Sequence, residues 1–374
     1  ARFRADGNKL IFVNGISRKQ IRTNSIRIIY GDGEVKYSIN NRKGEWFDLP
    51  RNFNLIIQNN DKRGIWFKNR RYAGQLRVSL INKKIQVINF LKLEKYLKSV
   101  VSSEMPKEFP LPALQAQAIA ARTYALKSLG KNKLFDVKST QSSQVYLGIE
   151  AESSKTNKAV ISTRSLALFY NEKLINAVFH SSSGGRTEDS GEVWKYQLPY
   201  LKSVVDYDQD STNYRWSVKF KSRELMNLFP ELGGVNGLQV IDKSNSNRVL
   251  KAEIYGPNGK QLISGKDLRK KLKLLSTKFD IDLKFNELDK EIKFNNINYT
   301  DNKSSLLFMN KKDDDFFFEP LPMLPKDHFL LFKGYGAGHG VGMSQWGAKG
   351  MAEKGASFRK ILKHFYSGVE IKSY

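Results

Sequence analysis

An alanine-rich stretch at residues 112–129 is the feature that most constrains how this chain can fold. Its pattern predicts a helix that begins at Pro112, a favourable first-turn residue, and ends at Leu129, with Gly130 in the position after the helix. Small side chains leave so little bulk that another element can approach closely; they are Ala113, Ala116, Ala118, Ala120, Ala121 and Ala125. The sequence therefore predicts a buried helix.

A second helix is expected just before it, and this helix ends at Glu104. Pro106 stops an apolar stripe at helical spacing, formed by Leu91, Leu93, Tyr96, Leu97, Val100 and Val101. Glu104 thus lies at a proline-terminated helix end that leads into the buried helix, a suitable position for a general acid. By position alone a solvated surface charge is the better interpretation, because most glutamates are solvated.

Short alternating runs broken by glycine and asparagine fill residues 1–75 and predict a small β-rich domain. Asn14-Gly15 and Asp32-Gly33 separate such runs and are hairpin signals. Residues 76–80 and 84–89 predict a further hairpin that leads into the next part of the chain.

The remaining chain predicts mixed structure. Strands are expected at Leu166–Tyr170 and Leu174–Phe179. Residues 206–325 are richer in lysine, asparagine and aspartate, with a helix at Lys266–Leu275 and no motif of known chemistry. Ser357–Tyr366 predicts a closing helix. The expected fold class is α+β.

The charge is strongly positive: 63 basic residues against 37 acidic ones give +26, spread through every region. This predicts a broad field that attracts a polyanion, such as nucleic acid, anionic lipid or the bacterial cell wall. The absence of cysteine excludes disulfides, thiolate metal sites and a cysteine nucleophile. No apolar run approaches the ~18–20 residues that span a bilayer, so we expect a protein peripheral to a membrane or anchored by a segment outside this sequence.

The glycine-rich segment Gly334–Gly342 completes no G-x-G-x-x-G, and no Gly-Lys-Ser/Thr follows it, so nucleotide binding is not expected. Alternate glycines favour a backbone that passes close to a ligand or another strand. The run from Gly342 to Gly347 resembles a serine nucleophile elbow, but its second glycine falls one position late. His180 and His339 fit orienting or hydrogen-bonding roles better than a zinc site, so no metal is expected.

The polar run Ser139–Gly148 has the donors and acceptors that a sugar would need, although a plain polar loop explains it equally well. Aromatic residues near these segments could stack on sugar faces or belong to the core; they are Tyr124, Tyr146, Trp194, Tyr335 and Trp346.

Taken together, three segments resemble the SpoIID/LytB family of bacterial cell-wall proteins: Leu97–Lys127, His180–Leu201 with Ser183-Gly184-Gly185-Arg186-Thr187, and Gly334–Gly347. The resemblance implies four parts: an N-terminal β-rich domain (1–75), the first part of a catalytic core (76–205), an inserted α/β subdomain (206–325) and the C-terminal part of the core (326–374).

The resemblance implies a peptidoglycan lytic transglycosylase of the extracytoplasmic cell envelope, or alternatively a non-catalytic activator of a cell-wall amidase. Glu104 matches the family's catalytic glutamate and would act as the single acid and base on MurNAc–GlcNAc strands. Residues 135–148 lack the cysteine and histidine ligands of the zinc site found in some members, so neither zinc nor another cofactor is expected.

Residues in or near the matching motifs are assigned to glycan binding or to positioning the acid: Arg122, Tyr124, Gln144, Tyr146, His180, Ser182, Ser183, His339, Ser344, Gln345 and Trp346. The expected partners are peptidoglycan glycan strands and, for an activator, a cell-wall amidase. Nucleic acid is not expected as a partner, because only the net charge favours it and no binding motif supports it.

Overall fold

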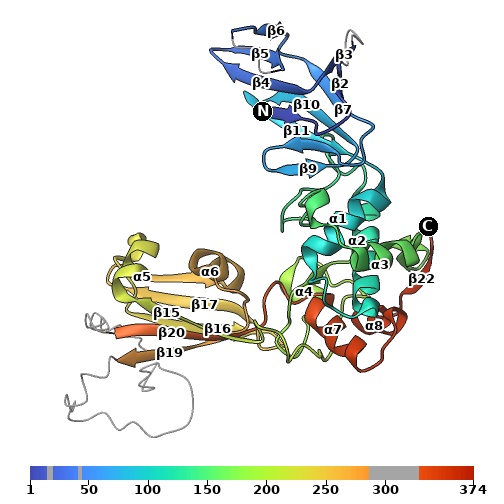
Figure 1. Ribbon diagram of the computed structural model, residues 1–374. Helices are drawn as coiled ribbons and strands as arrows, with labels where there is room; N and C mark the ends of the chain where they lie inside the picture. The colour runs from blue at the N-terminus through green and yellow to red at the C-terminus, as the bar shows by residue number, and fades with distance from the viewer. Residues whose placement is uncertain (15–19, 41–43, 286–327) are drawn as a thin grey trace, which may run out of the picture. The chain divides into compact units, whose positions relative to one another are not determined.

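The computed structural model describes residues 1–14, 20–40, 44–285 and 328–374 (Figure 1). The chain forms two compact units, each of which is described by itself. Unit 1 comprises Ala1–Ala177, Ser357–Arg359 and Glu370–Tyr374, and unit 2 comprises Val178–Ala356 and Lys360–Val369. Helices and mainly antiparallel sheets occur in both, which confirms the predicted α+β class.

Unit 1 begins with two antiparallel sheets that share one hydrophobic core. The first sheet has the order β6-β5-β4-β1-β8-β9, with bounds Phe47–Leu49, Glu34–Ile39, Ser25–Gly31, Arg2–Arg4, Ile65–Phe67 and Arg70–Tyr72. The second has the order β11-β10-β7-β2-β3, with bounds Lys84–Phe90, Gln75–Ile81, Asn54–Gln58, Leu10–Asn14 and Gln20–Thr23. Core side chains from both sheets, such as Ile28 and Ile57, are fully buried because alternate residues of each strand point inward.

The predicted hairpins in the described residues are confirmed. Strands β4 and β5 pair across the Asp32-Gly33 turn, and β10 and β11 pair across Asn82-Lys83. Both Asn82 and Lys83 have positive φ, as a two-residue type I′ turn requires. The Asn14-Gly15 prediction falls partly outside the described residues.

The two predicted helices of unit 1 are confirmed. Helix α1 spans Leu93–Glu104 and α2 spans Leu111–Ser128, with Gly130 in the left-handed conformation expected just after a helix. The alanines of α2 are buried, and α1, α3 (Ser154–Ser162) and β12 (Leu166–Tyr170) pack against it. Close packing is possible because alanine presents only a methyl group.

The strand predicted at Leu174–Phe179 is wrong. Residues Lys173–Leu174 form β13, which pairs with β12 beside β22 (Glu370–Ser373), whereas Phe179–His180 form β14 in unit 2. The run is broken because the chain passes from one unit to the other after Ala177. Its second part therefore pairs in parallel with β21 (Met343–Ser344) instead of continuing the hairpin.

Unit 2 contains two three-stranded sheets with helices packed on them. The orders are β15-β20-β19 (Arg215–Lys221, His328–Tyr335, Phe279–Phe285) and β16-β17-β18 (Gly237–Lys243, Val249–Gly256, Gly259–Ser264). Helices α5 (Ser222–Leu228) and α6 (Gly265–Leu272) share a core with these strands. Unit 2 also contains α4 (Ser190–Val193), α7 (Gln345–Glu353) and most of α8 (Phe358–Phe365). The mixed structure and the helices predicted near residues 266–275 and 357–366 are confirmed.

The expected boundary near residue 75 falls at the first residue of β10, which pairs with β7 in the same sheet. The four-part division of the chain otherwise stays a prediction.

Candidate functional site

Glu104 is the last residue of α1, where the chain leaves the helix in an extended conformation at Met105. Its side chain is half-buried. The backbone N–H of Val145 donates a hydrogen bond of 2.6 Å to Glu104 Oε1. The polar run predicted to bind sugar therefore reaches the helix end and fixes one oxygen of this carboxyl group.

Two tyrosines stack beside the loop that carries Val145. The rings of Tyr96 and Tyr146 stack with centroids 5.3 Å apart, and the Tyr146 hydroxyl donates to Asn89 Oδ1 at 2.7 Å. Burial, and then the nearby Glu104 and Tyr124, raise the pKa of Tyr96 far above its usual range. The Tyr96 hydroxyl thus stays a neutral donor, and Glu104 is near enough to raise the pKa of Tyr96.

Gln144 connects this loop to both helices. Its side chain is fully buried, accepts from the Tyr96 hydroxyl at 2.9 Å and donates to the Ala121 carbonyl at 3.2 Å. These bonds hold the loop that carries the Val145 N–H. Direct contact of Gln144 with substrate stays a prediction.

Arg122 is fully buried in the interior of unit 1. Its guanidinium binds both carboxylate oxygens of Glu94, at 2.7 and 2.9 Å, and donates to the carbonyls of Val160 and Leu166. This bidentate pair joins α1 to α2 and accounts for a buried arginine. Its predicted glycan contact stays a prediction.

In unit 2 the serine–glycine segment and the glycine-rich segment lie side by side. Phe179 and His180 pair with Met343 and Ser344, and Ser182 exchanges two backbone hydrogen bonds with Ala337. The four glycines Gly336, Gly338, Gly340 and Gly342 have positive φ, and a Cβ on any of them would lie within 2.8 Å of a neighbouring atom. The predicted close passage of this backbone past another strand is confirmed.

His180 and His339 form a neutral pair, with ring centroids 5.4 Å apart. Burial, followed by Arg248, lowers the pKa of His339 to about 4, and burial, followed by His339, holds the pKa of His180 well below its usual range. The backbone N–H of Val341 donates to His339 Nδ1 at 3.1 Å, which fixes that nitrogen as the unprotonated one. Trp194 packs on the His339 ring at 5.3 Å.

Ser182 and Ser183 bind two buried aspartates. Ser182 donates to Asp208 at 2.6 Å and Ser183 donates to Asp206 at 2.5 Å. Asp208 also accepts from the backbone N–H groups of Gly184 and Gly185. Burial, and then the neighbouring Asp208, raise the pKa of Asp206 to about 7.

Arg248 reaches this network from the region that the sequence marks as an insertion. It is buried, its Nη2 donates to the Ser183 carbonyl at 2.8 Å, and its guanidinium lies against Gly340. Nearby, Glu188 accepts from the hydroxyls of Ser244 and Ser246. Sequence reasoning missed Asp206, Asp208, Glu188 and Arg248; the closely spaced Asp206 and Asp208 after the serine–glycine segment were the available signal.

Ser344, Gln345 and Trp346 form the start of α7. Ser344 caps the helix by accepting from the Gly347 N–H at 3.0 Å, and Gln345 is buried. Trp346 is partly exposed, and its backbone N–H donates to the Ser181 carbonyl at 3.0 Å. Ser344 also forms a side-chain hydrogen bond with Asp206, so its hydroxyl both caps the helix and joins the network of Ser183 and Asp206.

Within the described residues, no three side chains of the types His, Asp and Glu converge as metal ligands. No helix among those described is both long and apolar enough to cross a membrane.

The fold and site define a two-unit α+β protein that carries a glutamate at the end of a short helix and pairs a serine–glycine strand with a glycine-rich one. A family model described as "SpoIID: Stage II sporulation protein" matches residues 81–170, which include Glu104. The chain is 33% identical to Stage II sporulation protein D of Bacillus amyloliquefaciens, over 75% of this chain and 74% of that protein. The chain belongs to the SpoIID family, as the motif resemblance predicted.

Two other relatives show how widely the similarity extends. An uncharacterized protein of Brachyspira hyodysenteriae is 31% identical over 86% of this chain and 77% of its own length. The Amidase enhancer of Bacillus subtilis is 30% identical over 74% of this chain and 40% of its own length.

Proposed function

We propose that this protein is a peptidoglycan lytic transglycosylase of the bacterial cell envelope, with Glu104 as its single general acid and base. One observation carries the proposal: Glu104, in the segment matched by the family model, has its Oε1 fixed by the Val145 N–H at 2.6 Å. A catalytic carboxyl group must be oriented as well as present.

The proposed chemistry follows from that hydrogen bond. Because Oε1 accepts the Val145 N–H, the proton of the neutral acid is carried by Oε2. Oε2 gives this proton to the oxygen of the MurNAc–GlcNAc bond as the bond from C1 to that oxygen breaks, and the substrate's acetamido group stabilises the oxocarbenium ion. The carboxylate then takes the proton of the MurNAc 6-hydroxyl as its oxygen bonds to C1. Glu104 is restored, water takes no part, and one carboxyl replaces the usual pair.

In unit 1 we assign a direct glycan contact to Tyr124, whose side chain is partly exposed. In unit 2, taken by itself, the predicted residues with partly exposed side chains are His339 and Trp346. The buried residues among those predicted to bind glycan would act indirectly, by holding the helices and strands of the site in place. His339 is neutral, its Nδ1 accepts the Val341 N–H, and its ring also bonds the Phe179 backbone, so it would meet a ligand mainly through its ring face.

A second function is supported by one relative. The similarity to an Amidase enhancer favours a protein that activates a cell-wall amidase without cleaving glycan itself. This role would not need an ionisable group at position 104.

Digestion of purified peptidoglycan tests the two functions. The first predicts soluble fragments that end in 1,6-anhydroMurNAc, recognised by mass spectrometry because each lacks one water relative to a hydrolysed end. The second predicts no anhydro ends, with faster release of stem peptides when an amidase is added. Hydrolysed, reducing MurNAc ends would contradict both.

A further inference from the structure

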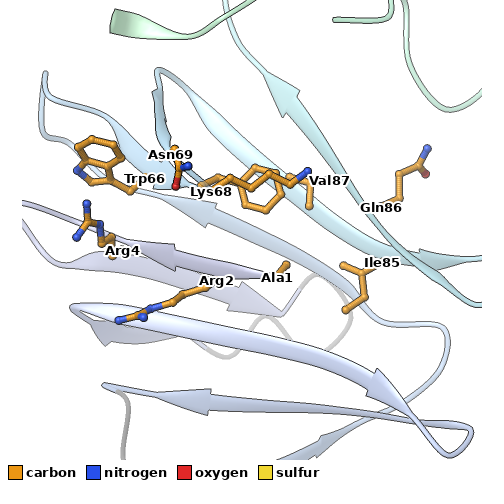
Figure 2. Close-up of a pocket in the computed structure, with 10 residues that line it drawn as sticks. Ala1, Arg2, Arg4, Trp66, Lys68, Asn69, Ile85, Gln86 and Val87 are labelled. Carbon is orange, nitrogen blue, oxygen red and sulfur yellow. The ribbon is translucent and has the colours of Figure 1, made fainter.

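We propose that a basic groove on the β-sandwich of unit 1 binds a linear polyol phosphate, a polymer of phosphodiester-linked polyols. The groove has a volume of about 870 Å³ and lies among β1, β8 and β11 (Figure 2). Its lining comprises Ala1, Arg2, Arg4, Trp66, Phe67, Lys68, Asn69, Ile85, Gln86 and Val87. None of these residues contributes to the surroundings of Glu104 described above.

The cations of the groove are available to a ligand. Among the described residues, Arg2, Arg4 and Lys68 lie within ion-pair distance of no carboxylate, whereas Arg71 outside the groove binds Glu150 at 2.6 Å. Arg2 and Arg4 occupy alternate positions of β1, so they share one face of the sheet at a spacing of roughly 6.6 Å. A row of guanidinium groups suits a chain that carries an anion at each repeat.

The aromatic residues of the groove are occupied by other groups. Arg4 and Arg71 lie 4.6 and 5.3 Å from the Trp66 ring, and the indole Nε1 donates to Asp6 at 2.6 Å. Phe67 stacks on the buried Phe3 at 5.0 Å. Trp66 therefore orients Arg4 by a cation–π contact and is not a free platform for a ring.

The engaged aromatic rings indicate which class of polyanion fits the groove. Single-stranded nucleic acid is held by bases stacked on aromatic side chains, and sugar polymers by rings stacked in the same way. A polyol phosphate has no ring to stack, and its phosphates form charge-assisted hydrogen bonds with guanidinium and ammonium groups. The groove offers charge without a free aromatic face, so it fits the polyol phosphate.

The test is titration calorimetry of the full chain with synthetic poly(glycerol phosphate) of defined length at low salt. The variant Arg4→Gln/Lys68→Gln removes two groove cations. The control Lys266→Gln/Lys270→Gln removes two exposed cations from α6 in unit 2. We expect the groove variant to bind about tenfold more weakly, since charge-assisted hydrogen bonds are lost, and the control to change by less than about twofold. Thermal unfolding of each variant checks that both remain folded.

Three results would overturn the proposal. Equal weakening of both variants would mean that the polymer binds the net charge and not the groove. If an oligothymidylate of equal charge bound more tightly than poly(glycerol phosphate), and the groove variant weakened that binding, the groove would be assigned to nucleic acid. Hyaluronate bound as tightly would remove the preference for phosphate. Glu104→Gln leaves poly(glycerol phosphate) affinity unchanged on this proposal, so its outcome is independent of the catalytic one.

Discussion

The backbone N–H of Val145 lies 2.6 Å from Glu104 Oε1, although the two residues are 41 positions apart in the chain. Gln144, beside Val145, is anchored to both helices through Tyr96 and the Ala121 carbonyl. The donor is therefore held by buried hydrogen bonds and not by a free loop, which is how a carboxyl group is kept in one orientation.

Val145→Pro removes this donor because proline has no backbone N–H. We expect the rate of anhydro-muropeptide release to fall on the order of 10²-fold, the usual scale for a misplaced catalytic group, with the fold retained. Val145→Ala keeps the N–H and should stay within about threefold of the native rate, since it changes only side-chain packing. Equal rates for the two variants would show that the hydrogen bond does not matter to catalysis.

Gly340→Ala tests the close approach of Arg248. A Cβ at Gly340 would lie 2.4 Å from the Arg248 Cζ, at φ +84°. Gly355 has nearly the same φ, +83°, and open space around it. We expect Gly355→Ala to cost about 1–2 kcal/mol of unfolding free energy from the backbone alone, and Gly340→Ala to cost about 1–3 kcal/mol more from the overlap. Equal costs in urea titrations would mean that the guanidinium moves aside freely.

Asp206→Asn tests the buried carboxylate pair by its pH dependence. With a folded pKa of about 7 against 3.8 in the free residue, Asp206 binds more protons when folded, so its contribution to stability is present below pH 4 and is lost as the pH rises toward 7. The variant has no such loss. Its unfolding free energy relative to the native protein should rise by a few kcal/mol at most between pH 4 and pH 7.5. His180 and His339, whose lowered pKa values affect stability in the opposite direction, are present in both proteins, so their effect cancels in the comparison. If the difference in unfolding free energy between the two proteins did not change with pH, the raised pKa of Asp206 would be contradicted.

Arg122→Met tests the buried pair with Glu94. It leaves Glu94 without its bidentate partner, and we expect a loss of about 3–5 kcal/mol, as for other broken buried pairs. Adding Glu94→Gln to it should recover part of this loss, because no uncompensated charge remains. A loss below about 1 kcal/mol would show that the pair contributes no more to stability than an exposed ion pair does.

Local sequence signals accounted for much of the fold. Three elements were predicted because a few neighbouring residues are enough to specify each of them: α2 by its alanines, α1 by its apolar stripe and the β4–β5 hairpin by Asp32-Gly33. The strand at 174–179 was not, since its pairing depends on where the chain leaves unit 1 for unit 2. Apolar alternation within a run gives no information on such a change of partner.

The residues of the candidate site also could be predicted only where the local sequence marks them. Glu104 stood out because a proline, a helix end and a family motif mark it. Arg248 has no local signal: its role comes from burial against Gly340, about 90 residues later in the chain, and from the Ser183 carbonyl. Gln144 appears in sequence as part of a polar loop, yet its side chain is fully buried, because only the folded chain brings Tyr96 and Ala121 to it.

The most direct measurement is the rate of 1,6-anhydroMurNAc formation from purified peptidoglycan by the native chain, Glu104→Gln and Glu108→Gln. Glutamine keeps an oxygen that can accept the Val145 N–H, so the first variant changes the proton and little else. Glu108 is an exposed carboxyl four residues later and serves as the control. We predict anhydro product from the native chain and from Glu108→Gln, and a loss on the order of 10³-fold or more for Glu104→Gln, since general acid–base catalysis contributes that much. Native-level anhydro product from Glu104→Gln would contradict the account.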